Sequence, residues 1–138
     1  MLTNNFLLAL NTAFGNGTSK TYKNASGITY STSSNIVAGT TQDVLVGTDN
    51  TTPSKTDYAI QTTGLTKVSS TKINPSYNFD SILFGWAVTT TYINNTNSAI
   101  TIREVGLSVS SNILLNREVI EPITIQPGES VAFTIKYN

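Results

Sequence analysis

The chain has 138 residues, a length that suits one domain with a hydrophobic core of its own. It contains neither cysteine nor histidine, which excludes disulfide bonds, the usual zinc sites and the Ser-His and Cys-His nucleophile systems. Eight acidic and eight basic residues cancel to a formal net charge of zero, which argues against a nucleic-acid partner and against electrostatic docking on anionic lipid.

Charged residues make up only 12% of the chain, against about 25% in an average soluble domain. Serine, threonine and asparagine take their place, a composition typical of strands and turns rather than of exposed helices. The N-terminus lacks the basic stretch of a signal peptide, and its apolar run, Phe6 to Leu10, is too short to span a bilayer. We therefore expect no membrane insertion.

The first segment, residues 6–14, spaces its apolar side chains in a way compatible with a short helix or a buried strand. Asn16-Gly17 then marks a turn. We expect an N-terminal arm of residues 1–17 that packs on its own domain or on a neighbour. A single β-sandwich domain would then occupy residues 18–138.

Two weakly apolar stretches, residues 28–31 and 35–38, predict short strands, and the apolar run of residues 43–47 predicts another. The next segment, residues 48–56, is rich in turn-forming residues and contains Pro53. It therefore predicts a long polar loop.

Residues 65–73 predict an edge strand, in which Lys67 and Lys72 guard against pairing with other chains. The strongest signal starts at Phe79, from which large apolar residues follow a period of two as far as Tyr92. This pattern predicts a long strand with one heavily apolar face.

Residues 100–109 predict a further strand, in which the apolar alternation slips by one position. An extra residue between Arg103 and Val105 would account for the slip, so we predict a β-bulge there. Residues 113–120 predict the antiparallel return strand, and Pro122 ends the ladder or lies on an edge.

The charges of this hairpin indicate how its two arms align. The register that sets Arg103 opposite Glu118 also sets Glu104 opposite Arg117, so that both pairs join opposite charges. A slip by one residue would set Glu104 against Glu118. The sequence therefore favours the first register.

Residues 126–129 read Gln-Pro-Gly-Glu, with Pro and Gly at the central positions of a type II turn. Residues 131–137 then alternate cleanly and predict the last strand. Repeated short strands separated by turns are typical of an all-β fold. We predict an antiparallel β-sandwich, Ig-like or jelly-roll-like, with a short N-terminal arm or helix.

Without histidine and cysteine, a pair of carboxylates is the remaining catalytic option, as in glycoside hydrolysis. Most of the acidic residues lie beside a basic residue, in a turn or at a strand end. Pairing or solvation explains such positions better than catalysis does. We therefore expect no enzyme activity, no catalytic residue and no cofactor.

Oxygen ligands for a calcium ion could come from Asp49, Asn50, Thr52 and Asp57. Their spacing matches no EF-hand loop, and turn formation by the Asp and Asn side chains is the better explanation. We therefore predict no metal site, although the sequence leaves open whether loop 48–57 binds a cation.

Aromatic side chains could form a platform on which sugars stack. Trp86 lies in the middle of the strongest predicted strand, which favours core packing for it. Tyr22, Tyr30 and Tyr77 lie in polar stretches and are better candidates for an exposed contact. Packing on the surface or between subunits is nevertheless favoured for them over sugar binding.

Two blocks of the chain resemble segments of phage tail-fibre-like and related virion proteins. Residues 46–60 resemble a segment in which a strand reading VGTG is followed by Thr, Pro and Ser residues and then by an Asp-x-Ala-Leu-like tetrapeptide. Residues 100–107, 114–117 and 131–137 resemble the C-terminal pattern I-x-E-(V/A)-G-L … L-L-x-R … (V/L)-x-(Y/F)-x-I. Asp49 stands where these proteins usually have glycine.

The resemblance implies a structural component of a bacteriophage particle, namely a capsid-decorating, head-fibre or tail-associated protein that acts through protein–protein assembly. It implies virion proteins of the capsid, portal or tail as partners, homo-oligomers, and a location in the virion after assembly in the host cytoplasm. The alternative is a receptor- or glycan-binding module at a virion or cell surface. Loops 48–57 and 69–78 would then recognise a host surface glycan.

Overall fold

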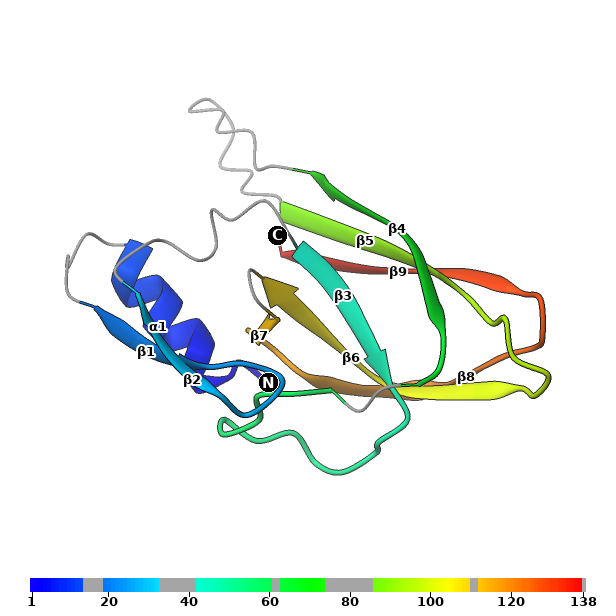
Figure 1. Ribbon diagram of the computed structural model, residues 1–138, viewed down its shortest axis with the longest axis horizontal. Helices are drawn as coiled ribbons and strands as arrows, with labels where there is room; N and C mark the ends of the chain where they lie inside the picture. The colour runs from blue at the N-terminus through cyan, green and yellow to red at the C-terminus, as the bar shows by residue number, and fades with distance from the viewer. Residues whose placement is uncertain (14–18, 33–41, 61–62, 74–85, 110–111, 138) are drawn as a thin grey trace.

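The computed structural model of the chain describes residues 1–13, 19–32, 42–60, 63–73, 86–109 and 112–137. Its strands form two antiparallel sheets and a separate hairpin, with a short helix at the N-terminal end (Figure 1). The predicted all-β fold, an antiparallel sandwich with a short N-terminal helix, is therefore confirmed. The predicted strand 35–38, the turn at Asn16-Gly17 and the part of the predicted long strand that precedes Trp86 lie outside the described residues.

Each sheet is built around one central strand. The first sheet has β6 at its centre and consists of β3 (Gln42–Gly47), β6 (Ile100–Val109), β7 (Ile113–Leu114) and β8 (Glu118–Ile125). The second sheet has β5 at its centre and consists of β4 (Thr66–Ile73), β5 (Trp86–Ile93) and β9 (Ser130–Tyr137). The predicted strands 43–47, 100–109 and 131–137 are thus confirmed, and residues 65–73 form an edge strand as expected.

A tight turn joins β8 of the first sheet to β9 of the second. The backbone nitrogen of Glu129 donates to the carbonyl oxygen of Gln126 at 3.0 Å, and Gly128 has a φ of 82°. These are the features of a type II turn with glycine at its third position, so the predicted Pro-Gly turn is confirmed.

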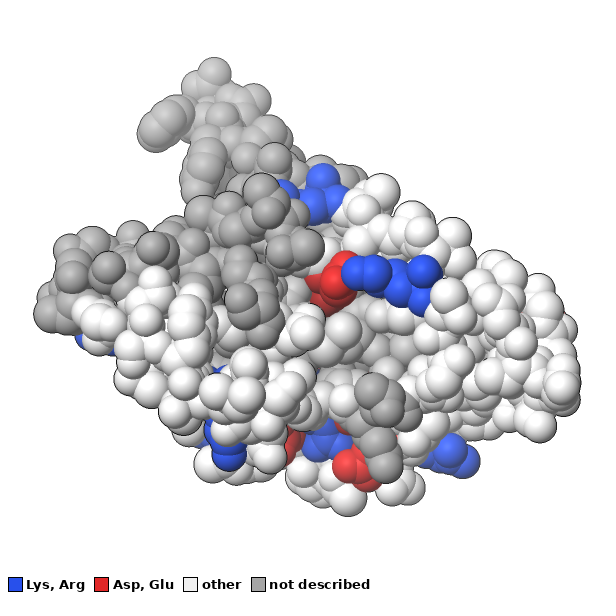
Figure 2. All heavy atoms as spheres, in the orientation of Figure 1, with Lys and Arg blue, Asp and Glu red and all other residues white. Residues whose placement is uncertain are grey.

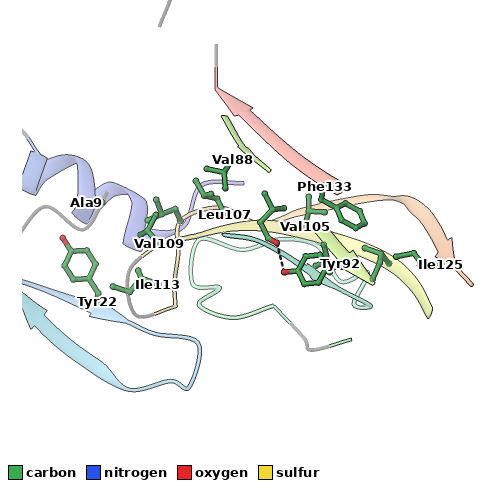
Figure 3. Packing of buried hydrophobic residues seen from close by; sticks show 14 residues of the cluster. Ala9, Tyr22, Val88, Tyr92, Val105, Leu107, Val109, Ile113, Ile125 and Phe133 are labelled. Atoms are coloured by element: carbon green, nitrogen blue, oxygen red, sulfur yellow. Dashed lines mark hydrogen bonds between the residues drawn. The ribbon is translucent and has the colours of Figure 1, made fainter. Parts of the chain in front are cut away.

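The core lies between the two sheets and continues toward the N-terminal helix (Figure 3). Leu107 of β6 is fully buried, and Val88 of β5 is 1% exposed. Tyr92 and Phe133 pack edge to face, with ring centroids 6.5 Å apart. The period-two pattern of β5 therefore does point Val88 and Tyr92 into the core, as its sequence predicts.

Side chains from the second sheet close the free edge of β3. The backbone nitrogen of Val44 donates to Oγ1 of Thr90 at 2.8 Å, and the hydroxyl of Tyr92 donates to the carbonyl oxygen of Val44 at 2.8 Å. Oγ of Ser70 donates to the carbonyl oxygen of Gln42 at 2.9 Å. These bonds satisfy backbone groups that an edge strand would otherwise expose.

The buried phenol of Tyr92 predicts a loss of stability in alkali. Burial, together with the charge of Asp43, raises the pKa of Tyr92 from 10.0 to about 12. A raised folded-state pKa contributes stability that is complete below the unfolded value and is lost as pH rises through the folded value. Between pH 10 and 12 we therefore expect the free energy of unfolding to fall by on the order of 2 kcal/mol from this group. Urea unfolding of Tyr92→Phe should show a shallower decline, whereas Tyr30→Phe should match the wild type.

The predicted register of the 100–120 hairpin is wrong. Glu104 lies opposite Val119 rather than opposite Arg117, and Glu118 lies opposite Val105. A register shift does occur at Arg103, where the alternation slips, but the extra residues lie on β8. The predicted bulge is therefore correctly located and assigned to the wrong strand.

The N-terminal residues pair with the segment between the two parts of the return strand. Between β7 and β8 the chain forms a bridge from Asn116 to Leu2. The backbone nitrogen of Thr3 donates to the carbonyl oxygen of Leu115 at 2.9 Å, and that of Arg117 donates to the carbonyl oxygen of Met1 at 3.0 Å. Residues 115–117 thus pair with the N-terminus between the two stretches, β7 and β8, that pair with β6.

The N-terminal segment forms the helix α1 (Asn4–Ala13). Of the two predicted alternatives, a short helix and a buried strand, the helix is confirmed. The helix packs on the same chain beside the hairpin of β1 (Lys20–Lys23) and β2 (Thr29–Thr32) (Figure 1). The side-chain amide of Asn5 anchors the helix to β1. Its Nδ2 donates to the carbonyl oxygen of Lys23 at 2.8 Å, and its Oδ1 accepts from the backbone nitrogen of Lys23 at 3.2 Å. In the described part of the chain, no helix is long and apolar enough to cross a membrane.

Candidate functional site: an arginine held by three carboxylates

The loop that follows β3 is shaped by its own aspartates. Oδ1 of Asp49 accepts from the backbone nitrogen of Thr51 at 2.9 Å, and Oδ2 of Asp57 accepts from the backbone nitrogen of Ser54 at 2.8 Å. The first is an Asx turn, and the second closes a turn in which the backbone nitrogen of Asp57 donates to the carbonyl oxygen of Ser54 at 3.1 Å. The turn-forming role predicted for the aspartates is therefore confirmed. The turns leave a second lone pair of each carboxylate free to bind elsewhere.

Arg117 binds both of these aspartates and a third carboxylate from β6. Its Nη2 lies 3.1 Å from Oδ2 of Asp49, and its Nη1 lies 3.0 Å from Oδ2 of Asp57. Its Nε donates to Oε2 of Glu104 at 2.5 Å. Nη2 also donates to Oγ1 of Thr51 at 3.3 Å. All three nitrogens of the planar guanidinium are thereby hydrogen-bonded, as its fixed arrangement of donors allows.

The cluster is buried at its centre and open at its rim. Side-chain exposure is 1% for Glu104 and 5% for Arg117, but 22% for Asp57 and 35% for Asp49. A buried charge is costly unless it is paired and hydrogen-bonded. Glu104 and Arg117 therefore depend on each other, whereas the two aspartates retain contact with water.

The pKa values follow from these contacts. Hydrogen bonds from Thr51, with the charge of Arg117 as a smaller contribution, lower the pKa of Asp49 below its ordinary value. Burial alone would lower the pKa of Arg117, but its hydrogen bonds to Glu104 and Asp57 outweigh that effect and raise it. Near neutral pH, Asp49 and Arg117 therefore both carry charge.

Two glycines make room for the cluster. A Cβ atom at Gly47 would lie 2.6 Å from Cδ of Glu104, so no side chain fits beside that carboxylate. A Cβ atom at Gly106 would lie 2.5 Å from the carbonyl oxygen of Asn116. Gly47 faces Glu104 across the ladder from β3 to β6. The glycine positions are thus set by close approach of neighbouring groups rather than by backbone conformation.

The segment that carries Arg117 is fixed on both sides. The backbone nitrogen of Leu115 donates to the carbonyl oxygen of Leu107 at 2.8 Å, and that of Leu107 donates to Oδ1 of Asn116 at 2.6 Å. On the other side, Oγ1 of Thr3 donates to the carbonyl oxygen of Leu114 at 2.7 Å. This rigid support aims the arginine side chain under the loop 48–57.

The lowered pKa of Asp49 predicts a dependence of stability on acid. A depressed folded-state pKa contributes stability that is present above the unfolded value, 3.8, and is lost as pH falls through the folded value. We expect Asp49→Asn to have a lower free energy of unfolding than the wild type at about pH 6, and to lose less of it as the pH falls to about 2. Urea unfolding measures both quantities. Glu121→Gln, an exposed control on β8, should keep the wild-type slope. Equal slopes for all three proteins would contradict the assigned role of Asp49.

A shallow hollow of about 390 Å³ lies next to the cluster and shares Asp57 with it. Its lining includes Asn4 of α1, Lys23 of β1, and Lys55 and Tyr58 of the loop. Nζ of Lys23 lies 3.8 Å from the centroid of the Tyr58 ring, a cation–π contact. Most of the lining residues are polar, but the surface that they expose to the hollow is mainly apolar, and Lys23 already covers one face of the Tyr58 ring.

The structure distributes the aromatic candidates differently from the prediction. Tyr22 is fully buried, so its proposed exposed contact is wrong, and its ring packs 6.2 Å from that of Tyr30. Tyr30 is 37% exposed and remains available at the surface. Tyr77 and the side chain of Trp86 lie outside the described residues. Tyr22 is buried because it faces α1, which its polar neighbours in sequence do not reveal.

The proposed cation ligands are brought together only in part. Asp49 and Asp57 share one guanidinium, whereas Asn50 and Thr52 are exposed. In the stretches that the structure describes, no group of three or more His, Cys, Asp or Glu residues is placed to hold a metal ion.

Sequence reasoning missed that Glu104 and Arg117 are buried and that Arg117 binds the loop. The available signal was the position of Arg117 two residues after the apolar run Ile113-Leu114-Leu115, and of Glu104 among apolar residues of the predicted strand 100–109. Figure 2 shows that charged side chains are sparse on one face of the molecule and stand in small groups where the two signs meet.

The chain matches no known protein-family model, no curated protein and no solved structure.

Proposed function

We propose that this chain is a structural component of a bacteriophage particle, a capsid-decorating, head-fibre or tail-associated module that acts through protein–protein assembly. Its partners would be virion proteins of the capsid, portal or tail and further copies of itself. It would be located in the virion after assembly in the host cytoplasm.

One observation carries the proposal. The two blocks that resemble virion proteins are far apart in sequence, yet their polar residues meet at Arg117: Asp49 and Asp57 come from the first block and Glu104 from the second. Gly47 and Gly106, which also belong to these blocks, provide the space for that meeting. Asp57, Glu104 and Arg117 follow the resemblance, whereas Asp49 replaces its usual glycine. The pattern thus includes residues that join distant parts of the fold, which supports a common architecture more strongly than scattered strand residues would.

The bonding of the carboxylates to Arg117 also favours a structural role. The hydrogen bonds from Thr51 and the charge of Arg117 lower the pKa of Asp49, so this carboxylate is charged and is a poor proton donor near neutral pH. The cluster fastens the loop 48–57 to the sheet, so its direct effect is mechanical. An assembling module benefits from such rigid loops because less entropy is lost on association.

Mass spectrometry of purified particles of the phage that encodes the chain tests the proposal. We expect the chain in the particles, at a copy number that matches the capsid lattice for a decorating protein or the tail for a tail-associated one. Absence of the chain from purified, infectious particles would overturn the proposal.

The hollow beside Tyr58 favours receptor or glycan binding as a second candidate function. Its lining of amide, hydroxyl and ammonium groups next to an aromatic ring suits a ligand rich in hydroxyl groups. A glycan array should then give a signal that Tyr58→Ala abolishes and that Tyr30→Ala, on the neighbouring hairpin, retains. No signal at high protein concentration would eliminate this candidate.

A further inference from the structure

The outer strands of the two sheets differ in how they are protected. An edge strand exposes unpaired N–H and C=O groups, and proteins protect such edges with charges, prolines, bulges or covering side chains. The edge of β3 is covered by the side-chain bonds of Ser70, Thr90 and Tyr92.

Two further edges carry other forms of protection. β4 has a register shift at Val68 and carries Lys67 and Lys72. β8 contains Pro122 and Glu121 and has an irregular register with β6. Bulges, prolines and charges of this kind oppose the addition of another strand.

β9 has neither a bulge nor a proline, and its one charged residue, Lys136, lies next to its end. It pairs with β5 from Ser130 to Tyr137 without a register shift, and among the described residues no strand lies on its other side. Its residues from Ser130 to Ile135 carry no charge, no proline and no glycine. A long, regular, uncharged edge is a ready template for a strand of another chain.

The core is also open on the side of β9. Ile123 of β8 is 40% exposed, although it lies opposite Ile102, which is fully buried. Val131 and Ile135 of β9 are only partly buried. On the opposite side, where β3 meets β4, Nζ of Lys67 lies 2.8 Å from Oδ2 of Asp43 and helps to close the sandwich.

We propose that a second copy of this chain pairs with β9 through its own β9, in antiparallel orientation, so that the two sheets become one. The two copies would be related by a two-fold axis perpendicular to the sheet, so the core-facing sides of both sheets lie on the same side of the joined sheet. Odd-numbered residues of one β9 therefore oppose odd-numbered residues of the other. The register centred on Phe133 sets Val131 opposite the partner copy's Ile135. It also sets Ala132 opposite the partner copy's Thr134.

The charges at the ends of β9 select a second copy as the occupant. Glu129 directly precedes the strand and Lys136 lies near its end, and both are exposed. In this register Lys136 lies opposite the partner copy's Ser130, next to its Glu129 but on the other face of the sheet, so each end of the new ladder carries both signs of charge. Parallel pairing in register would set Lys136 beside Lys136 and Glu129 beside Glu129. Oε2 of Glu129 accepts from the backbone nitrogen of Gln126 at 2.7 Å, which holds the acid at the beginning of the strand.

This inference rests on the proposed assembly role, and sedimentation velocity of the purified chain over a range of concentrations tests it separately. The wild type should form a dimer. The double variant Ala132→Lys/Thr134→Lys places lysines opposite lysines at the new contact, so its dissociation constant should rise by about tenfold or more. The matched control Ser69→Lys/Thr71→Lys, on the exposed β4, should bind as the wild type does.

Charge complementation provides the decisive measurement. An equimolar mixture of Ala132→Lys/Thr134→Lys with Ala132→Glu/Thr134→Glu should recover association that neither variant shows alone. A wild type that is monomeric at every concentration would overturn the inference, and so would equal losses in the β9 and β4 variants. Should the lysine variant unfold, hydrogen exchange of the wild type decides: outward-facing amides of β9 gain protection with concentration, and unchanged exchange overturns the inference.

The two proposals fail differently. A chain that is present in phage particles but monomeric in solution overturns the β9 contact alone. A chain that dimerises through β9 but is absent from particles overturns the virion role alone.

Discussion

Arg117→Met is expected to lower the free energy of unfolding by about 3–5 kcal/mol, the range for breaking a buried ion pair. The variant leaves the carboxylate of Glu104, 1% exposed, without its charged partner. It also releases Asp49 and Asp57, so the loop 48–57 should exchange its amide hydrogens faster. Urea unfolding followed by circular dichroism measures the first effect, and hydrogen exchange measures the second.

A surface ion pair provides the control for Arg117. Lys67 binds Asp43 at 2.8 Å but is 47% exposed, so Lys67→Met should cost less than about 1 kcal/mol. Adding Glu104→Leu to Arg117→Met should recover part of the loss, because the buried charge is then removed. The assigned role of the cluster fails if Arg117→Met costs no more than Lys67→Met.

Gly106→Ala is expected to destabilise the fold by about 3 kcal/mol, at the upper end of the range for overpacking. The new methyl group would lie 2.5 Å from the carbonyl oxygen of Asn116 and 2.6 Å from Cδ1 of Ile60. The first of these atoms belongs to the backbone that supports Arg117 and cannot move alone. The midpoint of urea unfolding should therefore fall steeply while the slope stays the same.

Gly64 separates the effect of crowding from that of backbone conformation. It has a φ of 81°, and a Cβ atom there would meet no atom within 4 Å. Gly64→Ala therefore carries only the cost of a left-handed alanine, about 1 kcal/mol. Equal losses for Gly106→Ala and Gly64→Ala would show that Gly106 is not kept by close packing.

The elements that the sequence predicts well are those set by neighbouring residues. The alternation of residues 131–137 places Phe133 in the core, and Pro127 with Gly128 forms the expected turn. Both features depend on side chains within a few positions of one another, because side-chain period and turn chemistry act locally.

The register of β8 shows where local patterns fail. Opposite charges at Arg103 and Glu118 favour an alignment, yet each such exposed pair contributes only about 0.2–1 kcal/mol. The backbone bonds from Leu115 and Arg117 to residues 1–3 and the burial of the Glu104–Arg117 pair outweigh that preference. The predicted pair between Glu104 and Arg117 forms, but through a buried side-chain contact rather than a ladder position.

The sequence by itself determined the strands 43–47, 100–109 and 131–137 and the turn at Pro127-Gly128, because the period of apolar residues and the chemistry of Pro and Gly depend on adjacent positions. It revealed neither β1 nor the division of the predicted strand 113–120 into β7 and β8. Only the tertiary structure decided that Tyr22 is buried, that α1 packs on its own chain and that Arg117 joins Asp49, Asp57 and Glu104. Among the described residues, tertiary contacts join segments up to 116 residues apart, as between Met1 and Arg117. Their energy is gained only when the whole chain closes around its core, so tertiary packing selects them.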